Sequence, residues 1–504
     1  MPRRPSISSF RAFSLDVASA EPLHRQLYDE IRKAILAGRL AAGSRLPASR
    51  ELANVTRVSR NTVLSAYEQL LAEGYIQSRA GSGTFVAHSL PEAAVPEAAH
   101  TESLAPASST PRSLSVRGER VAGSTIVDLP LMPTANTFRP GLPALDHFPM
   151  DIWRRLMDRR LRRASVRMLS YDDPQGYLPL REAIAAHLGA ARGARCSADQ
   201  IMIVNGSQQA IHLVTRMLTD EGDQVWLESP GYFAARAAFQ AAGAHVVPVP
   251  VDEQGMDVAE GIRRSPHARL AYCTPSHQNP LGVTLSLPRR MALMQWAATN
   301  GSWVLEDDNA SEYRYSGRPL AALQGIDTSH HVLYAGTFSK VLFSSLRLGY
   351  LVLPPDLVKP FVHARELMDR QTPGIVQTVL ADFMNEGHFA RHIRRMRTLY
   401  ATRLDALRSA VDRHLGGMGT LHEAEGGMSR VLWLPEGVDD REATIALAAV
   451  NIQSLPVSSY QCGEPVRSGL VLGFTGVDEQ ELETGVRRMA EVLRPLCEAA
   501  RSKA

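Results

Sequence analysis

The sequence predicts a multidomain protein in which a small α+β domain is joined by a linker to a larger α/β domain with a mainly parallel sheet. Three observations predict this fold class. Residues 21–88 carry apolar residues at helical spacing and then a strand–turn–strand pattern. Residues 89–125 are rich in Pro, Ala, Ser and Glu and have no apolar periodicity. Residues 126–504 alternate strand and helix patterns, which is typical of an α/β fold.

Length and composition exclude several classes of protein. A chain of 504 residues with 44% hydrophobic residues has room for two or three globular domains. It contains no apolar run long enough to span a bilayer, and its N-terminus does not have the pattern of a secretory signal. The cysteines are widely scattered without metal-ligand spacing, so we predict no disulfide framework, no metal site and a cytoplasmic location; they are Cys196, Cys273, Cys462 and Cys497.

The excess positive charge lies near the N-terminus. Residues 1–88 hold 12 Lys and Arg against 7 Asp and Glu, whereas the remaining residues hold 43 against 45. This asymmetry predicts an anionic partner for the N-terminal part of the chain only.

The predicted elements of the N-terminal domain follow a recognisable order. Apolar residues recur at helical spacing from Leu23 to Ile35, and Gly38 is placed to end that helix. Ser49 is expected to cap a short second helix that ends near residue 54, and a turn over residues 55–59 leads to a third helix, RNTVLSAYEQLLAEG. The stretch YIQSRAGSGTFVA then predicts two strands around a Gly-rich turn. Helix, helix, turn, helix and wing form a winged helix-turn-helix.

Several polar side chains in this domain suit DNA. Arg and Asn in the first turn of the third helix can pair with base edges in the major groove, and basic residues near the second helix and on the wing can contact phosphates. The alternative is a small helical domain that binds protein. The predicted DNA-binding residues are Arg45, Arg50, Arg60, Asn61, Thr62 and Arg79.

The N-terminal stretch resembles a known family. Its segments GSRLPASRELA, VSRNTVLSAYEQLLAEGYI and SRAGSGTFV match the pattern of the winged-helix domain of the GntR family of bacterial regulators over residues 21–87. This resemblance implies operator DNA as a partner. Residues 89–125 are predicted to form a flexible linker, and a coil of that length spans roughly 35 Å, which is close to the separation of about 34–36 Å between DNA half-sites.

The stretch AGTFSKVLFSSLRLGYLVL is the strongest functional signal in the α/β domain. A buried strand is predicted over residues 331–335, and a turn of small residues follows it and ends on Lys340. The hydroxyl groups of Thr337 and Ser339 together with Arg347 suit a phosphate. A partly desolvated lysine beside a bound phosphate can form a Schiff base, as a site for pyridoxal phosphate (PLP) requires. A surface lysine on an ordinary turn is the alternative.

Other polar groups follow the predicted strands of this domain, where ligands bind in open α/β sheets. A PLP site needs a carboxylate for the pyridine nitrogen, a donor for the phenolic oxygen, a phosphate cradle and often an aromatic ring against the cofactor. An ordinary structural role is the alternative for each residue taken alone, and their order along the chain favours PLP. The remaining predicted cofactor-binding residues are Ser207, Gln208, Tyr232, Asn279 and Asp307.

The order of these motifs over residues 130–485 resembles the fold-type I PLP enzymes of the aspartate aminotransferase superfamily. The resemblance implies that Lys340 is the Schiff-base lysine, that Asp307 pairs with the pyridine nitrogen, and that Arg347 binds the phosphate. Together with the head, the chain is similar to MocR-type (GabR-like) regulators through LPASRELA, NGSQQA, ESPGY, TPSHQNPLG, EDDN, GTFSK and LRLGYLV. Asn309 stands where that subfamily commonly has tyrosine and is also predicted to bind the cofactor, with Asn279 in place of the contact that the tyrosine makes.

The resemblance implies a domain-swapped homodimer that regulates transcription and senses PLP, or an amine or amino acid, through an aldimine at Lys340. The strand GLVLGF lacks the arginine that aminotransferases use for the substrate carboxylate, and Arg467 and Arg430 are the substitutes that we predict for an effector carboxylate. The alternatives are an active aminotransferase that carries a DNA-binding head and a PLP-free scaffold that binds DNA. We expect a regulator rather than an enzyme, at most with a partial transamination half-reaction.

Overall fold

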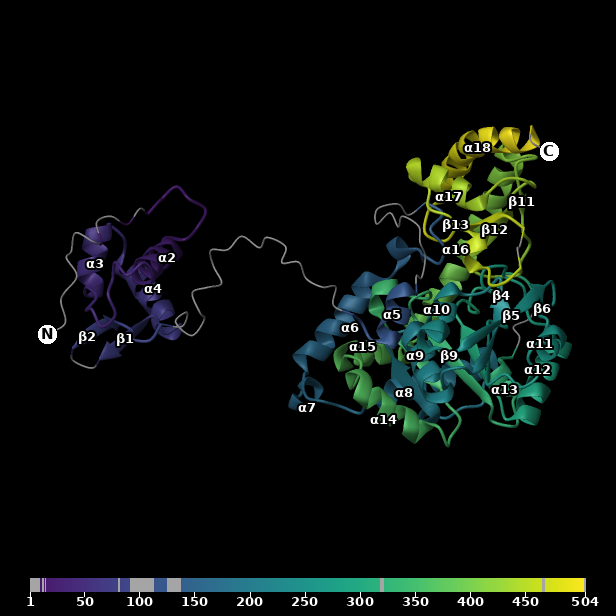
Figure 1. The fold of residues 1–504 in the computed structure, drawn as a ribbon, viewed down its shortest axis with the longest axis horizontal. Helices are drawn as coiled ribbons and strands as arrows, with labels where there is room; N and C mark the ends of the chain where they lie inside the picture. The colour runs from purple at the N-terminus through teal and green to yellow at the C-terminus, as the bar shows by residue number, and fades with distance from the viewer. Residues whose placement is uncertain are drawn as a thin grey trace. The chain divides into compact units, whose positions relative to one another are not determined.

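The computed structural model describes residues 10, 13, 15–79, 82–90, 113–124, 137–317, 321–464 and 467–502 (Figure 1). The chain divides into two compact units, Met1–Ser113 and Leu114–Ala504. Within the described ranges, no helix combines the length and the apolar character that crossing a bilayer requires. Each unit is described by itself.

The first unit is the predicted winged helix-turn-helix. Residues from all three helices, among them Leu27, Ile31, Leu52 and Val63, form one buried apolar core, because each helix is apolar on a single face. The two strands of the wing pair antiparallel, and Arg79 lies opposite Gly83 at the turn. The elements are α2 (Leu23–Leu36), α3 (Ser49–Thr56), α4 (Arg60–Ala72), β1 (Ile76–Arg79) and β2 (Gly83–Val86).

One prediction in this unit is wrong. Ser49 is the first residue of α3 rather than its cap; the capping position is held by Ala48, and the helix continues to Thr56, beyond the predicted end. Arg57 then adopts φ +56° and ends the helix in the left-handed conformation. By contrast, Ser59 caps α4 through its hydroxyl, which accepts a hydrogen bond from the N–H of Thr62.

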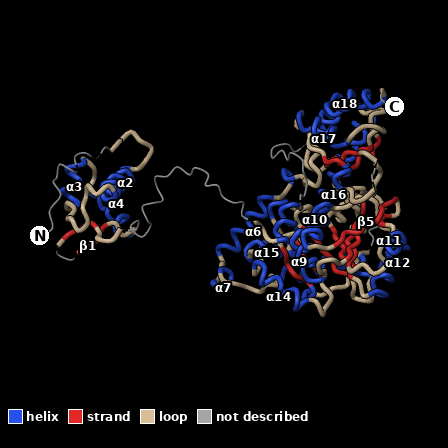
Figure 2. The backbone as a smooth tube through the Cα atoms, in the orientation of Figure 1, coloured by secondary structure: helices blue, strands red, loops and turns tan. Residues whose placement is uncertain are grey.

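The second unit is built on a mainly parallel sheet, as predicted. Its strand order is β3-β10-β9-β8-β7-β4-β5-β6; the pairs β9·β8, β8·β7, β7·β4 and β4·β5 are parallel, whereas β10 and β6 are antiparallel to their neighbours. Figure 2 shows these strands in the interior with helices outside them. The strands are β3 (Ile201–Val204), β4 (Gln224–Ser229), β5 (His245–Asp252), β6 (Gly255–Met256), β7 (Leu270–Cys273), β8 (Trp303–Asp308), β9 (Val332–Thr337) and β10 (Gly349–Val352).

Both faces of this sheet are covered by helices, which explains why its strands read as continuous apolar runs. One face, with Leu227 and Leu305, packs against α9, α10 and α14. The other face packs against α11 and α12 around Trp226 and against α8 and α15 around Tyr334. The helices are α6 (Met150–Arg162), α7 (Val166–Leu169), α8 (Leu178–Arg192), α9 (Ser207–Leu218), α10 (Phe233–Ala242), α11 (Val258–Arg264), α12 (Leu287–Asn300), α13 (Leu323–Ile326), α14 (Val358–Asp369) and α15 (Gly374–Asn385).

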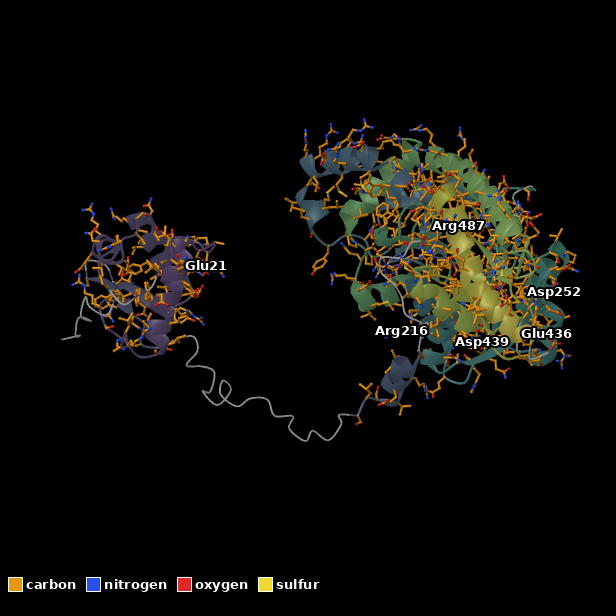
Figure 3. All side chains as sticks on the ribbon, turned by 90° about the horizontal axis from the view of Figure 1, so that it is seen from above. Glu21, Arg216, Asp252, Glu436, Asp439 and Arg487 are labelled. Atoms are coloured by element: carbon orange, nitrogen blue, oxygen red, sulfur yellow. The ribbon has the colours of Figure 1, made fainter. Side chains whose placement is uncertain are left out.

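A second, antiparallel sheet forms a further layer of this unit. Its strand order is β11-β12-β14-β13, and it shares a core with the long helices α16 and α18. Charged side chains such as Arg216, Glu436 and Arg487 stay exposed on the outside of the unit (Figure 3). The elements are β11 (Thr420–Leu421), β12 (Ser429–Trp433), β13 (Leu455–Pro456), β14 (Gly469–Gly473), α16 (His388–His414), α17 (Asp440–Ala449) and α18 (Glu479–Arg501).

The end of the predicted linker is structured. Within residues 89–125, α5 (Val116–Gly123) forms a helix whose first turn is capped by Ser115. Arg120 of this helix forms an ion pair with Glu221, beside the carboxyl end of α10. The prediction that the linker has no regular structure is therefore wrong for α5, and residues 91–112 and 125 lie outside the described residues.

Candidate functional site

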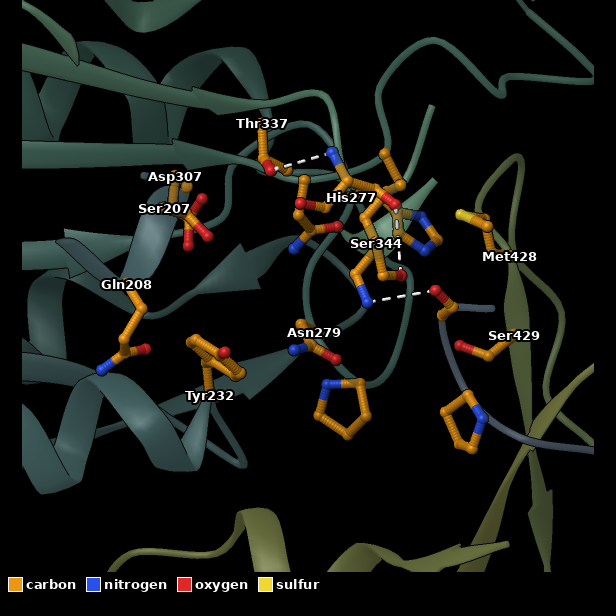
Figure 4. Close-up of a pocket in the computed structure, with 18 of the residues that line it drawn as sticks. Ser207, Gln208, Tyr232, His277, Asn279, Asp307, Thr337, Ser344, Met428 and Ser429 are labelled. Atoms are coloured by element: carbon orange, nitrogen blue, oxygen red, sulfur yellow. Dashed lines mark hydrogen bonds between the residues drawn. The ribbon is translucent and has the colours of Figure 1, made fainter. Parts of the chain in front are cut away.

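A cavity of about 320 Å³ opens where the parallel strands end, and all the residues predicted from the sequence to bind the cofactor line it (Figure 4). They come from turns that are widely separated along the chain, because the carboxyl ends of parallel strands meet at one edge of the sheet. These residues are Ser207, Gln208, Tyr232, Asn279, Asp307, Asn309, Thr337, Ser339, Lys340 and Arg347.

Lys340 lies on the turn after β9, with its amine at the cavity. Its Nζ donates a hydrogen bond of 3.1 Å to the carbonyl oxygen of Gly141. Burial and the positive charge of Arg139 lower the pKa of the Lys340 amine, and the carboxylate of Asp307 partly opposes this. A larger fraction of this amine is therefore neutral, and so nucleophilic, than in an exposed lysine.

Asp307 lies at the end of β8 with one oxygen bound and one free. Its Oδ2 accepts a hydrogen bond of 2.6 Å from the phenol of Tyr272, which lies on the neighbouring strand β7. Its Oδ1 is buried and has no hydrogen-bond partner among the described residues. Burial raises the pKa of Asp307 to about 6, against the effect of the Tyr272 bond. A cationic N–H donor placed in the cavity would satisfy the free oxygen.

The opposite end of the cavity suits an anion. Gly206 adopts φ +94° and starts α9, so the N–H groups of the first turn, together with Ser207, face the cavity. Arg347 donates a hydrogen bond of 2.8 Å to the carbonyl oxygen of Asn205 and remains exposed beside Gly206. The Oγ of Ser339 is buried without a partner among the described residues. Positive charge, a helix amino end and hydroxyl donors are the groups that bind phosphate.

Polar and aromatic side chains form the walls between these two ends. Tyr232 holds the capping position of α10, and burial raises the pKa of its phenol to about 12. The amide of Gln208 donates to the carbonyl oxygen of Ala234, which fixes α9 against α10. The N–H of Asn279 donates to Thr274 at 3.1 Å, and the side chain of Asn279 points into the cavity (Figure 4).

Sequence reasoning missed several residues of this site. Tyr272, which binds Asp307, lies inside an apolar run and has no signal of its own. His277 is in a quoted motif but was given no role, and burial lowers the pKa of its imidazole to about 3, so it is neutral. Phe233 and Ser344, close in sequence to predicted residues, also line the cavity. Further lining residues come from segments far from these along the chain, among them Gly141, Met428, Ser429, Leu455 and Tyr460.

The structure does not bring the two predicted effector arginines to the cavity. Arg430 is buried in β12, where its guanidinium donates to the carbonyl oxygens of Gly426, Ser429 and Ala424. Arg467 lies over the ring of Trp433. Neither lines the cavity, and the contacts of both lie elsewhere, so their assignment to an effector carboxylate stays a prediction.

The predicted DNA contacts of the first unit lie on or near its surface. Arg60 and Asn61 are exposed in the first turn of α4, and Arg60 donates to the hydroxyl of Ser49 at 3.3 Å. The hydroxyl of Thr62 is 2.8 Å from that of Ser59, so it also takes part in the cap. Among the basic residues, Arg50 is exposed at the start of α3. Arg45 forms an isolated antiparallel β-bridge with Phe85. The guanidinium of Arg79 lies over the Phe85 ring, 5.0 Å from its centroid. Their DNA contacts stay predictions.

Comparisons with known proteins divide the chain in the same way. The family described as aminotransferase class I and II matches residues 143–489, and the family described as bacterial regulatory proteins, gntR family, matches residues 23–86. The probable rhizopine catabolism regulatory protein MocR of Rhizobium meliloti is 39% identical over 475 residues, which cover 94% of each chain. The HTH-type pyridoxine biosynthesis transcriptional regulator PdxR of Corynebacterium glutamicum is 32% identical over 462 residues, with 91% of this chain and 93% of that protein covered.

A solved structure matches the second unit. Kynurenine aminotransferase of Pyrococcus horikoshii, in complex with PMP, is 31% identical with a TM-score of 0.67, and the match covers 72% of this chain and 92% of that one. The likeness to the two regulators extends over almost the whole chain, whereas the likeness to this aminotransferase leaves out more than a quarter of it.

Proposed function

The chain belongs to the MocR-like transcriptional regulators of the gntR family, and from that membership we propose that its aminotransferase-like domain is a sensor that holds PLP at Lys340. Regulators of this kind join a DNA-binding head to an aminotransferase class I and II domain. The head implies DNA as a partner, and the aminotransferase-like domain implies use of PLP. The proposal adds which residues hold the cofactor and what its binding controls.

The cavity residues fit the cofactor. The free, buried Oδ1 of Asp307 is suited to a protonated pyridine nitrogen, and the unpartnered Oγ of Ser339 is suited to a phosphate oxygen. Arg347 and the amino end of α9 would add positive charge around that phosphate. When bound, PLP supplies an electrophilic carbonyl carbon and an electron-withdrawing ring. The unpartnered Oδ1 of Asp307, at the cavity that Lys340 also lines, is the single observation that carries the assignment.

Lys340 is the residue through which an effector would act. Its amine, partly neutral because its pKa is lowered, is placed to bind the cofactor carbon, and an amine or amino acid that enters the cavity would compete with it. PLP itself is the alternative signal. In either case the ligand shifts DNA binding only through a difference in its affinity for two states of the protein.

The proposal includes a homodimer, in which the head of one chain lies near the body of the other. Large apolar side chains on the surface of the second unit support self-association, because monomers rarely expose such groups together. Val166 and Leu169 of α7, and Tyr171 two residues after its end, are more than 70% exposed. Light scattering on the purified full-length chain checks the stoichiometry, and a monomer at micromolar concentration would contradict it.

The experiment that tests the sensor uses the small number of lysines. The sequence contains four, at positions 33, 340, 359 and 503. In the first measurement, full-length protein is incubated with PLP, reduced with borohydride and digested, and the labelled peptide is identified. In the second, binding of the protein to its own upstream DNA is measured by fluorescence anisotropy with and without PLP. Lys340→Ala is the test variant, and Lys359→Ala, an exposed lysine on α14, is the matched control.

Two results together support the proposal. The cofactor is found on the peptide that contains Lys340, and PLP changes the DNA affinity of the wild type and of Lys359→Ala but not that of Lys340→Ala. Labelling spread over the other lysines, or a PLP effect that survives in Lys340→Ala, contradicts it. Sustained turnover of an amino donor by the wild type would favour the aminotransferase that the comparisons speak against.

A further inference from the structure

Two helices of the second unit carry a large excess of arginine. Residues 150–163, which are α6 and the residue after it, hold six arginines and two aspartates. Residues 388–397, the first part of α16, hold four arginines and no acidic residue. Residues 89–504 as a whole hold 43 Lys and Arg against 45 Asp and Glu. These two segments therefore concentrate positive charge that is balanced elsewhere in the unit.

The fold brings the two segments side by side, although they lie far apart in the chain. His147, three residues before α6, places its Nδ1 3.1 Å from Nη2 of Arg395 in α16. Arg159 in the third turn of α6 forms an ion pair with Glu386, two residues before α16 begins. Glu386 and Arg395 are nine positions apart, or about 14 Å along a helix. The two helices therefore run antiparallel and in contact over that length.

Each helix turns its apolar side to the core and its arginines outward. In α6, Trp153 and Leu156 are buried, and in α16, Phe389, Ile393 and Met396 are buried. The arginines occupy the remaining sides of both helices. The exposed ones define the α6–α16 basic surface; they are Arg154, Arg155, Arg162, Arg163, Arg391, Arg394, Arg395 and Arg397.

Acidic neighbours do not cancel the charge of this surface. Arg159 and Arg160 pair with Asp382 and are not part of it. Arg154 lies 3.2 Å from Asp151, but both side chains are largely exposed, and such a pair is weak and screened by salt. Four arginines form no ion pair with any side chain in the described ranges; they are Arg155, Arg162, Arg163 and Arg394.

A nucleic acid duplex is the polyanion that fits this surface. A duplex carries a phosphate about every 3.4 Å along each strand, so guanidinium groups spread over about 14 Å lie opposite about four phosphates of one strand. Arginine binds phosphate through two parallel hydrogen bonds, and an exposed helix face with no deep pocket suits a backbone rather than a small anion. The head of the same chain implies DNA as a partner, so a duplex is the polyanion that the chain already holds.

We propose that the α6–α16 basic surface contacts the phosphates of operator DNA beside the site that the head reads. The inference goes beyond the proposed function, because it makes the sensor domain a second DNA-binding surface, and it rests on DNA binding by the head. Phosphate contacts carry no sequence information, so this surface adds affinity for flanking DNA of any sequence.

The test uses full-length protein and two duplexes. The short one is the shortest piece of the protein's own upstream DNA that still binds specifically, and the long one adds about two helical turns of unrelated sequence on each side. The test variant replaces four arginines of the surface with Gln: Arg154, Arg155, Arg162 and Arg394. The control variant makes the same change of charge at four exposed arginines elsewhere in the second unit: Arg216, Arg441, Arg487 and Arg494.

We expect the wild type and the control variant to bind the long duplex about tenfold or more tightly than the short one, because the flanks add phosphate contacts. The test variant should bind both duplexes alike, with the affinity of the wild type for the short one. On the long duplex, the slope of log affinity against log salt should fall by about 3–4, since each lost phosphate contact removes about 0.9. Cofactor absorbance and light scattering verify that PLP loading and stoichiometry are unchanged.

Two results overturn the inference: a wild type that binds the short and the long duplex equally, or a control variant that loses as much affinity for the flanks as the test variant. If the fourfold change prevents PLP loading, Arg155→Glu alone replaces it, because Arg155 is exposed and forms no ion pair among the described residues. This variant should lose affinity for the long duplex only, and unchanged affinity overturns the inference. A wild type that binds neither duplex specifically would overturn the proposed regulator as well, so the two failures are distinguishable.

Discussion

Tyr272 and Asp307 are joined across the neighbouring parallel strands β7 and β8 by a hydrogen bond of 2.6 Å from the phenol to Oδ2. Both side chains are buried. Burial raises the pKa of Asp307 to about 6, and the Tyr272 bond limits that rise. Tyr272 therefore helps to keep the carboxylate ionised at neutral pH and leaves only Oδ1 for a ligand.

Replacing Tyr272 with Phe should weaken PLP binding about tenfold or more, because a hydrogen bond to a charged group contributes roughly 1.5–3 kcal/mol. The loss should be larger at pH 6 than at pH 8, since the carboxylate then protonates more readily. Titration with PLP, followed by cofactor absorbance, measures it. Tyr67→Phe removes a phenol bound to Pro47 in the first unit and serves as the control. Equal affinity in wild type and Tyr272→Phe would show that the bond is not needed.

The affinity for PLP should depend on the ionisation of Asp307. Its pKa lies above the usual carboxyl value, at about 6, so the ionised form that would pair with the cofactor is present above that pH and is lost below it. We expect binding to weaken as the pH falls through 6 in the wild type. Asp307→Asn should bind weakly at every pH and lack this step. If Asp307→Asn showed the same weakening of binding near pH 6, the titrating group would be the cofactor phosphate or another residue.

Arg192 and Asp308 form a buried ion pair with Nε and Oδ2 3.0 Å apart. Arg192→Met should reduce the free energy of unfolding by about 3–5 kcal/mol, because it leaves a buried carboxylate without its cation. Burial tends to raise the pKa of Asp308, but the charge of Arg192 holds that pKa below its usual value. The stabilisation by the ion pair is therefore present above the pKa that Asp308 has in the unfolded chain, and it is lost as the pH falls through the lower pKa of the folded state. Urea unfolding at pH 7 and at lower pH measures both effects, and Arg192→Met with Asp308→Asn should recover part of the loss.

In the DNA-binding head, Arg60→Ala should cost about 1–3 kcal/mol of discrimination between operator and random DNA, because Arg60 lies in the first turn of α4, where base edges are contacted. Arg79→Ala on the wing should weaken binding to both DNAs equally and reduce the salt dependence. Anisotropy titrations at several salt concentrations distinguish the two. An equal loss on both DNAs for Arg60→Ala would make it a phosphate contact.

Ser59→Ala should destabilise the head by about 1 kcal/mol, since it removes the hydroxyl that accepts from the N–H of Thr62 at 3.1 Å. Ser49→Ala is the matched control, because that serine is not a cap. Thermal unfolding of the full-length variants, followed by the transition of the head, gives both values. A larger loss for Ser49→Ala than for Ser59→Ala would reverse the roles that the structure gives them.

The parts of the fold that local sequence determines were predicted well. Buried strands such as β8 and β9 begin as apolar runs and end in polar residues, Asp308 and Thr337, and the edge where they end follows from their being parallel. Lys340, Asp307 and Ser207 were therefore found from the sequence and lie at one cavity. The cap of α3 was predicted wrongly, because Ser49 precedes a helical pattern and yet is the first residue of that helix, after Ala48.

What depends on tertiary packing was not predicted. The helix α5, VRGERVAG, contains two glycines and little apolar periodicity, and it is held in place by an ion pair with Glu221. Tyr272 looks like any aromatic residue of a buried strand until β8 is placed beside it.

Two layers of the second unit supply the walls of the cavity. Asp307 and Lys340 lie at the ends of strands of the main sheet, whereas Ser429 and Leu455 lie in the antiparallel sheet. A molecule bound there touches both layers at once, so its binding free energy adds to the cohesion between them. At a ligand concentration of 100 times the dissociation constant this amounts to about 2.7 kcal/mol. Heating the protein without ligand should then allow the two layers to melt separately, and a saturating ligand should merge them into a single cooperative transition at a higher temperature.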